Sequence, residues 1–185
     1  YSGQTAGYAA RQIQDMNYKK VIVIGPSHSQ PMRNFCSVPG ATHYETPLGQ
    51  VPLDLDCIGR LRANPDYFQS IPDAHVWEHS VQIQVPILQR ILKNFTLVPI
   101  LAGQLDEKAT RAVGEILKKE MDNETLLVIS TDFTHYGPSY GYVPFTTDIP
   151  ENLEKLDMSV FDPVRMKDLS GLYRRLDVTR ATVCG

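Results

Sequence analysis

Residues 19–28 read KKVIVIGPSH, an apolar run that ends in glycine, proline, serine and histidine. A strand that is apolar at every position, rather than at alternate positions, is typically buried on both faces in a parallel sheet covered by helices. The preceding residues, 3–17, carry apolar side chains at helical spacing, so a helix is expected to lead into this strand. A helix followed by a buried strand is a building unit of α/β folds.

The same alternation returns along the chain. Further strands are predicted at 97–101 and 126–129, and Asp106 is expected to cap the helix that lies between them. Asp162 and Pro163 match an N-cap with proline at the first helical position, which predicts that another helix begins there. The predicted fold class is α/β, with a mostly parallel central sheet and helices on both faces.

Two stretches interrupt this rhythm. Residues 39–55 contain two glycines and several prolines around short apolar pieces, which indicates an irregular hairpin or loop. Residues 80–92 have helical spacing, but Pro86 should kink that helix or mark its true start. No linker or low-complexity tract divides the chain, so a single domain over residues 1–185 is predicted.

Composition narrows the class of protein. The 185 residues include 18 Lys+Arg and 21 Asp+Glu, for a formal net charge of −3, and no basic run favours a nucleic-acid partner. The apolar stretches are far shorter than the ~20 residues that span a bilayer. Three cysteines without CxxC spacing favour a reducing compartment, and we expect a cytoplasmic protein. Because the chain begins with Tyr-Ser-Gly and stops at Cys-Gly, both natural ends are expected to be missing.

Candidate functional residues follow the predicted strands. Ligands of open α/β sheets bind beyond the carboxyl ends of the strands. His28 follows the first strand, and Asp132 and His135 follow the strand at 126–129. A carboxylate three residues before an imidazole can orient the ring and raise its basicity, which suits metal ligation or general-base catalysis. The simpler alternative is that loop histidines of this kind only cap turns.

The other histidines and the cysteines have less distinctive surroundings. Glu78 and His79 lie at an expected helix start, where they are either a third functional cluster or ordinary capping residues. Cys36 and Cys57 are expected to be small buried hydrophobic residues, Cys184 is a candidate thiolate, and His43 and His75 are expected on the surface. Standard P-loop, dinucleotide-binding and GxSxG motifs are absent from the sequence, so a histidine-based site remains.

Five segments together resemble one known family. In chain order they are 23–28 (VIGPSH), 44–49 (YETPLG), 78–80 (EHS), 130–137 (STDFTHYG) and 184–185 (CG). They resemble the Memo family, whose microbial members are known as the Memo-like protein B of the AmmeMemoRadiSam system. The resemblance implies the fold of class III extradiol ring-cleaving dioxygenases, which are non-haem iron enzymes.

The resemblance also implies a set of site residues. His28 and Cys184 match metal ligands of the family, whose remaining histidine ligand would lie just upstream of Tyr1. Tyr1 matches a residue that lines the pocket, and Glu78 and His79 are expected to bind the ligand there. His135 matches the acid–base position of the related dioxygenases, with Asp132 as its partner. Iron(II) is the expected cofactor, and copper is the alternative.

The resemblance leaves open whether the site is catalytic. Dioxygenases of this fold bind iron through two histidines and a carboxylate, whereas here Cys184 stands at the third position, and a soft thiolate favours copper(I) or changes the potential of iron. The leading hypothesis is a metal pocket with redox or oxygen-dependent activity on a small molecule. One alternative is a non-catalytic signalling adaptor that binds a phosphotyrosine peptide at the same pocket. Another, based on the Asp/His pairing alone, is a metal-dependent hydrolase.

Overall fold

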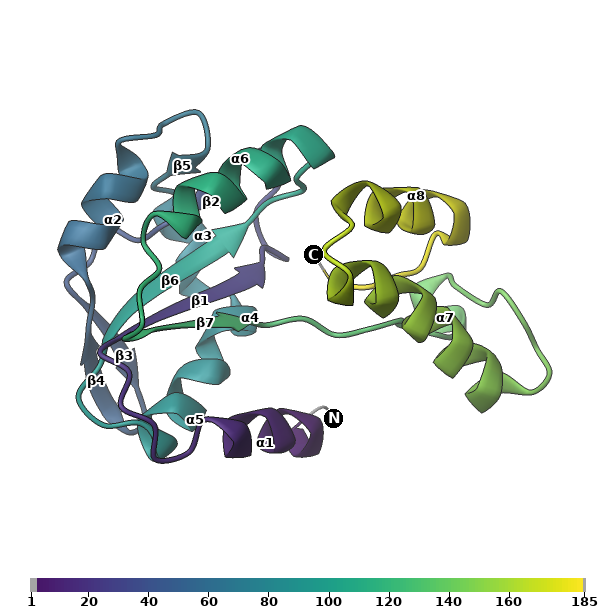
Figure 1. Cartoon of the computed structure of the whole chain (residues 1–185), viewed down its shortest axis with the longest axis horizontal. Helices are drawn as coiled ribbons and strands as arrows, with labels where there is room; N and C mark the ends of the chain where they lie inside the picture. Colours follow the sequence, from purple (N-terminus) through teal and green to yellow (C-terminus); the bar gives the residue numbers. More distant parts are fainter. Residues whose placement is uncertain (1–2, 185) are drawn as a thin grey trace. The chain divides into compact units, whose positions relative to one another are not determined.

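The computed structural model describes residues 3–184 (Figure 1). The described chain divides into two compact units, the first unit (residues 3–130) and the second unit (residues 131–184). The polypeptide passes from one to the other directly after the last strand of the sheet. The single domain expected over residues 1–185 stays a prediction.

The first unit is built on a mostly parallel sheet. Within residues 3–130, the strands in spatial order are β5 (Phe68–Gln69), β2 (Cys36–Ser37), β6 (Thr96–Ala102), β1 (Lys20–Pro26) and β7 (Thr125–Ile129). The interior strand β1 runs parallel to both of its neighbours, β6 and β7, and β2 runs antiparallel to β6. The predicted α/β class with a mostly parallel sheet is confirmed.

Burial of the strands follows their apolar patterns, with one exception. Val21, Ile22 and Val23 of β1 are completely buried, as expected for a strand covered on both faces. At the edge strand β7, in contrast, Leu127 and Ile129 are exposed although every residue from 126 to 129 is apolar. An apolar run therefore predicted the strand correctly but could not tell a central strand from an edge strand.

Helices pack on the sheet of the first unit, with α6 on one side and α4 and α5 on the other (Figure 1). Their bounds are α1 (Gly3–Gln12), α2 (Leu55–Arg62), α3 (Pro72–Val76), α4 (His79–Gln82), α5 (Gln84–Ile91) and α6 (Glu107–Lys118). Asp106 caps α6 as predicted, because its carboxylate accepts a hydrogen bond of 2.8 Å from the Ala109 N–H. The helix expected over 80–92 is divided at Ile83, so that Pro86 falls in the first turn of α5.

The predicted interruption at 39–55 is a hairpin of β3 (His43–Thr46) and β4 (Gly49–Pro52). Cys36 and Cys57 are buried in the hydrophobic core, as expected. Burial raises the pKa of each thiol to about 12, so both are inert packing residues.

The second unit is mainly a helical pair. It contains a short 3₁₀ turn η1 (Pro138–Tyr140) and the helices α7 (Ile149–Arg165) and α8 (Leu169–Thr179), which pack against each other. A segment without regular secondary structure, 180–184, follows α8. Across residues 3–184, no helix has the length and apolar character that crossing a membrane requires.

The predicted helix start at Asp162 and Pro163 is wrong. Pro163 lies inside α7, close to its end, where the proline interrupts only the last turn. The proline of the first turn is Pro150, and the cap of the next helix is Asp168, whose carboxylate accepts a 2.8 Å bond from the Gly171 N–H. Asp162 and Pro163 thus match the pattern of a helix start, but Pro150 and Asp168 are the residues that begin the two helices.

Candidate metal centre

His28 of the first unit is held by a buried carboxylate. The turn after β1 brings His28 to Glu78, the N-cap residue of α4, whose side chain is almost fully buried. The backbone N–H of His28 donates to Glu78 Oε2 at 2.6 Å, and the ring Nδ1 lies 2.8 Å from Glu78 Oε1. Glu78 Oε1 also accepts a bond of 3.0 Å from the Ser80 N–H. One carboxylate therefore accepts hydrogen bonds from both the backbone and the ring of His28.

This contact depends on a close approach between α4 and the end of β1. The Ser80 hydroxyl donates to the Pro26 carbonyl at 2.9 Å. A Cβ atom placed on Gly25 would lie only 2.5 Å from Ser80 Oγ and 2.7 Å from Ser80 Cβ. Only glycine leaves room for Ser80 at this point, so Gly25 is the residue that lets Glu78 reach His28.

The surroundings of Glu78 fix the proton on His28. Burial alone would raise the pKa of Glu78, but hydrogen bonds from the His28 backbone, the His28 ring and the Ser80 N–H outweigh it and lower the pKa to about 2. An ionised carboxylate only accepts hydrogen bonds, so Nδ1 of His28 must be the donor. The lone pair of the neutral ring is then on Nε2, the ring nitrogen that can act as a metal ligand.

His79 lies beside this pair. Its ring stacks on that of His28, with 4.7 Å between the ring centroids and an interplanar angle of 22°. Its Nδ1 is 3.5 Å from Glu78 Oε1, while 72% of its side chain is exposed. His28, Glu78 and His79 thus form one compact group at the carboxyl end of β1.

In the second unit, His135 is held by the backbone. Its Nδ1 is 2.6 Å from the carbonyl oxygen of Thr182, and its backbone N–H donates to the same oxygen at 3.2 Å. The Thr182 hydroxyl returns a bond of 2.7 Å to the His135 carbonyl. Because a carbonyl only accepts, Nδ1 of His135 is again the donor and Nε2 carries the lone pair of the neutral ring.

Two further ligand-type atoms lie beside Nε2 of His135. Cys184 Sγ is 3.7 Å away and Asp132 Oδ2 is 3.9 Å away. The Cys184 N–H donates to the Asp132 carbonyl at 3.0 Å, which holds the end of segment 180–184 against residue 132. The thiol, imidazole and carboxylate ligand atoms all lie within 4.8 Å of one another. These are three standard ligand types for a transition metal, and their donor set fits such an ion.

The predicted site residues thus fall into two groups. Asp132, His135 and Cys184 come together in the second unit, and Glu78, His79 and His28 come together in the first. The prediction that His28 and Cys184 bind the same metal stays a prediction, as do the roles that the resemblance implies for each residue. Tyr1 lies outside the described residues.

The sequence did not predict the hydrogen-bond partners that hold His135 and His28. Asp132 was expected to orient His135, but the Thr182 carbonyl is the group bonded to Nδ1. A backbone carbonyl leaves no signal in residue identity. The contact between Glu78 and His28 spans 50 positions, and the only hint of it was that Glu78 precedes His79.

The expectation for His75 is wrong, whereas His43 is exposed as expected. His75 is half-buried, and its Nε2 is 3.0 Å from the Ser37 hydroxyl. Burial lowers the pKa of His75 to about 4, against a smaller opposing effect from the charge of Glu78. His75 is therefore a neutral packing residue.

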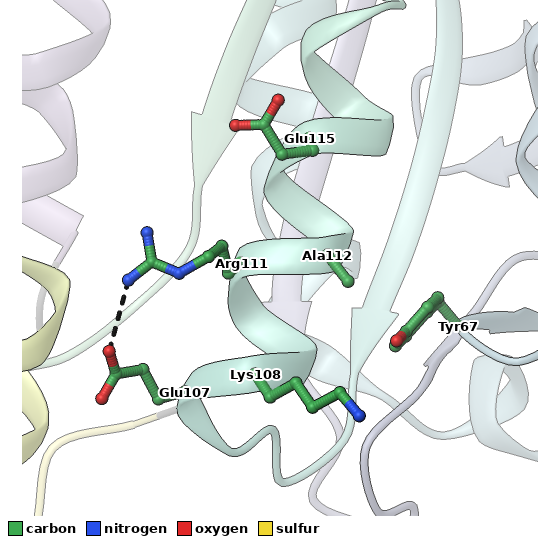
Figure 2. A pocket seen from close by; sticks show the side chains of 6 residues that line it. All are labelled: Tyr67, Glu107, Lys108, Arg111, Ala112 and Glu115. Atoms are coloured by element: carbon green, nitrogen blue, oxygen red, sulfur yellow. Dashed lines mark hydrogen bonds and ion pairs between the residues drawn. The ribbon is translucent and has the colours of Figure 1, made fainter.

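A separate open pocket lies on α6 (Figure 2). Its lining consists of Tyr67, Glu107, Lys108, Arg111, Ala112 and Glu115. Arg111 and Glu107 form an ion pair of 3.3 Å along the helix. Oppositely charged side chains one turn apart are ordinary on an exposed helix face, and none of the predicted site residues lines this pocket.

The fold and these two groups define an α/β protein with ligand-type side chains at the ends of parallel strands. A family model described as Memo-like protein matches residues 1–185. The chain belongs to the Memo family, and the resemblance drawn from its motifs is confirmed.

Known relatives agree with this assignment. The chain is 30% identical to a MEMO1 family protein of Thermoplasma volcanium over 186 residues and to one of Pyrococcus furiosus over 196 residues, and covers 64% and 67% of them. It is also 30% identical to the memo-1 homolog of Caenorhabditis elegans over 192 residues, 55% of that protein. All of this chain is covered in each comparison. The chain thus spans between half and two thirds of these relatives.

Proposed function

We propose that this Memo-family chain binds a transition metal ion, with His28 and Cys184 as ligands. His135 serves as a further ligand or as an acid–base residue. Asp132 supplies a carboxylate beside Cys184 and His135. Iron(II) is the proposed metal, since imidazole and carboxylate ligands suit it, and copper(I) is the alternative that the thiolate favours.

One observation carries this proposal. The thiol of Cys184 and the carboxylate of Asp132 lie 3.7 and 3.9 Å from the same nitrogen of His135. That nitrogen is Nε2, whose lone pair is fixed by the bond between Nδ1 and the Thr182 carbonyl. The tautomer that this bond fixes is the one in which Nε2 can act as a metal ligand, and the thiol and the carboxylate lie next to that nitrogen.

The bound metal would supply redox or oxygen-dependent chemistry to a small-molecule substrate. The chain's own contribution is to present the ligands and to move protons. Nε2 of His135 can accept a proton from a bound substrate, and the Asp132 carboxylate next to it would stabilise the imidazolium that results. The acid–base role of this pair is thus an alternative to direct ligation by His135.

Metal analysis of anaerobically purified protein tests the proposal. We expect near-stoichiometric iron or copper in the wild type, and loss of that metal in Cys184→Ala and His28→Ala. His43→Ala is the matched control, because His43 is an exposed histidine that belongs to neither group. Metal retained by His135→Ala, with loss of activity, would assign His135 to acid–base chemistry. A wild type that carries no metal and binds none on titration would overturn the proposal.

The finer predictions about cellular role are separate from metal binding. The phosphotyrosine-peptide adaptor, the cytoplasmic location and the lack of a nucleic-acid partner stay predictions. Retained affinity for a phosphotyrosine peptide after removal of the metal would favour the adaptor.

A further inference from the structure

We infer that Glu78 is a positioning residue for His28, because it fixes the histidine's tautomer and orientation so that Nε2 is presented to the metal. The inference rests on the proposed function, in which His28 is a metal ligand. It assigns to Glu78 a role through His28 rather than a contact with the metal or the substrate.

The hydrogen bonds of Glu78 support this role. Both carboxylate oxygens contact His28, one at the backbone N–H and the other at ring Nδ1, at 2.6 and 2.8 Å. The third bond, from the Ser80 N–H at 3.0 Å, anchors the carboxylate at the start of α4. A group held at both its backbone and its ring has little freedom to rotate. A carboxylate that receives the Nδ1–H of a metal-ligating histidine is a common arrangement around protein metals.

Burial argues that the arrangement is specific. Only 1% of the Glu78 side chain is exposed, compared with 40% of the His28 side chain. A buried carboxylate is costly unless its oxygens are hydrogen-bonded, and here three N–H groups satisfy them. A residue needed only to cap the four-residue helix α4 would require a single bond to Ser80.

A metal shared by His28, Glu78 and His79 explains the group less well. The lone pair of an imidazole nitrogen lies in the plane of its ring, so two histidines that bind one ion must have planes that meet at that ion. The rings of His28 and His79 are nearly parallel, at 22° with centroids 4.7 Å apart, and the His28 nitrogen on the Glu78 side, Nδ1, is already bonded to Glu78 Oε1 at 2.8 Å. The carboxylate also directs its oxygens at N–H donors, which suits an anchor.

Substitution of Glu78 by glutamine tests whether its carboxylate anchors His28. Glu78→Gln keeps the shape of the side chain but has one acceptor oxygen, while three N–H groups are directed at it. Its NH₂ group must therefore face at least one donor. We expect metal affinity to fall by about 10–100-fold, the usual effect of removing such a partner. Glu115→Gln is the matched control, because Glu115 is exposed on α6 of the same unit, and it should leave affinity unchanged.

A double substitution tests whether Glu78 acts through His28. When the variants are titrated with added metal, Glu78→Gln should cause no further loss of the weakened affinity that remains in the His28→Ala background, because the ligand that it positions is gone. An equal loss in both backgrounds would overturn the inference. Glu78→Asp, which keeps the charge on a shorter side chain, should retain part of the affinity that Glu78→Gln loses.

Nuclear magnetic resonance of the metal-free wild type gives a readout that needs no variant and no metal. With ¹⁵N-labelled histidine in its neutral form, His28 should carry its proton on Nδ1, and Glu78→Gln should shift it toward Nε2. A wild-type His28 that carries the proton on Nε2 would overturn the inference even if Glu78→Gln failed to fold. A protein that binds no metal but has the Nδ1–H tautomer would overturn the proposed function and leave the positioning intact.

Discussion

His28 in the first unit and His135 in the second carry their protons on the same ring nitrogen, but the chain secures them by different means. Nδ1 of His28 is bonded to a buried side-chain carboxylate, 50 positions away in the sequence. Nδ1 of His135 is bonded to a backbone carbonyl, 47 positions away. A side-chain anchor can be removed by one substitution, whereas a backbone anchor persists as long as the segment that carries it stays in place.

The two anchors also differ in charge. Glu78 is an ionised group whose pKa is lowered to about 2 by its hydrogen bonds, against the opposing effect of burial. The Thr182 carbonyl is neutral, and its position depends on the pairing of 182–184 with 132–135. Removing the charge of the anchor should therefore change the tautomer and orientation of His28, whereas His135 has no charged anchor to lose.

A third histidine, His75, extends the comparison, because burial rather than a hydrogen-bonded anchor keeps its ring neutral. Its pKa is lowered from 6.5 to about 4, so the neutral ring stabilises the fold fully above about pH 6.5. That stability should be lost as the pH falls from about 6.5 to 4, by about 3 kcal/mol. Denaturant unfolding of the metal-free protein at both ends of this range measures the loss.

Two histidine variants isolate the effect of His75. His75→Gln should remove this part of the pH dependence, whereas His43→Gln, at an exposed position, should keep it. Equal acid sensitivity of the wild type and His75→Gln would show that other groups control it.

Gly25→Ala should disturb the anchor of His28 and leave the anchor of His135 intact. The added Cβ would lie 2.5 Å from Ser80 Oγ, so α4 must shift away from the end of β1. We expect a loss of about 2 kcal/mol in the free energy of unfolding, which is typical of overpacking. We also expect a shift of the His28 tautomer with no change at His135. Thermal unfolding and ¹⁵N spectra of the histidines measure the two effects.

Gly59→Ala is the control for that experiment, because an added Cβ on Gly59 meets nothing within 4 Å. It should leave stability unchanged or raise it slightly, since alanine is the better helix former. If Gly25→Ala behaved in the same way, the close approach of Ser80 would not be what holds Glu78 in place.

Thr182→Ala has the smallest expected effect and tests the backbone anchor. The substitution removes the hydroxyl bond to the His135 carbonyl but leaves the Thr182 carbonyl in place. Stability should fall by about 1 kcal/mol, the usual contribution of one hydrogen bond. The His135 tautomer should be unchanged in ¹⁵N spectra. A tautomer shift as large as that of His28 in Glu78→Gln would contradict the distinction between the two anchors.

Much of the fold could be predicted because its signals are local. The run at 21–24 and the cap at Asp106 each depend on a few neighbouring residues, and both are confirmed. The helix start at Asp162 failed because two other positions, Pro150 and Asp168, carry the same type of signal. Local patterns identify candidates for a boundary, and packing selects among them.

The site was less predictable because its decisive contacts are long-range. The position of His28 after a strand and the spacing of Asp132 and His135 singled out these residues. No pattern could pair Glu78 with His28 or place the Thr182 carbonyl on His135, since these contacts appear only when the chain is folded. The family motifs supplied Cys184, which periodicity left as one candidate thiolate.

The central claim is that Cys184 ligates a metal, and the absorption spectrum of the cobalt(II)-loaded protein tests it most directly. A bound thiolate gives a sulfur-to-cobalt charge-transfer band in the near ultraviolet. The chain has three cysteines, of which Cys36 and Cys57 are buried in the core. We predict the band in the wild type and in Cys36→Ser, and its loss in Cys184→Ser. A band that persists in Cys184→Ser, or cobalt bound by the wild type without this band, would contradict the claim.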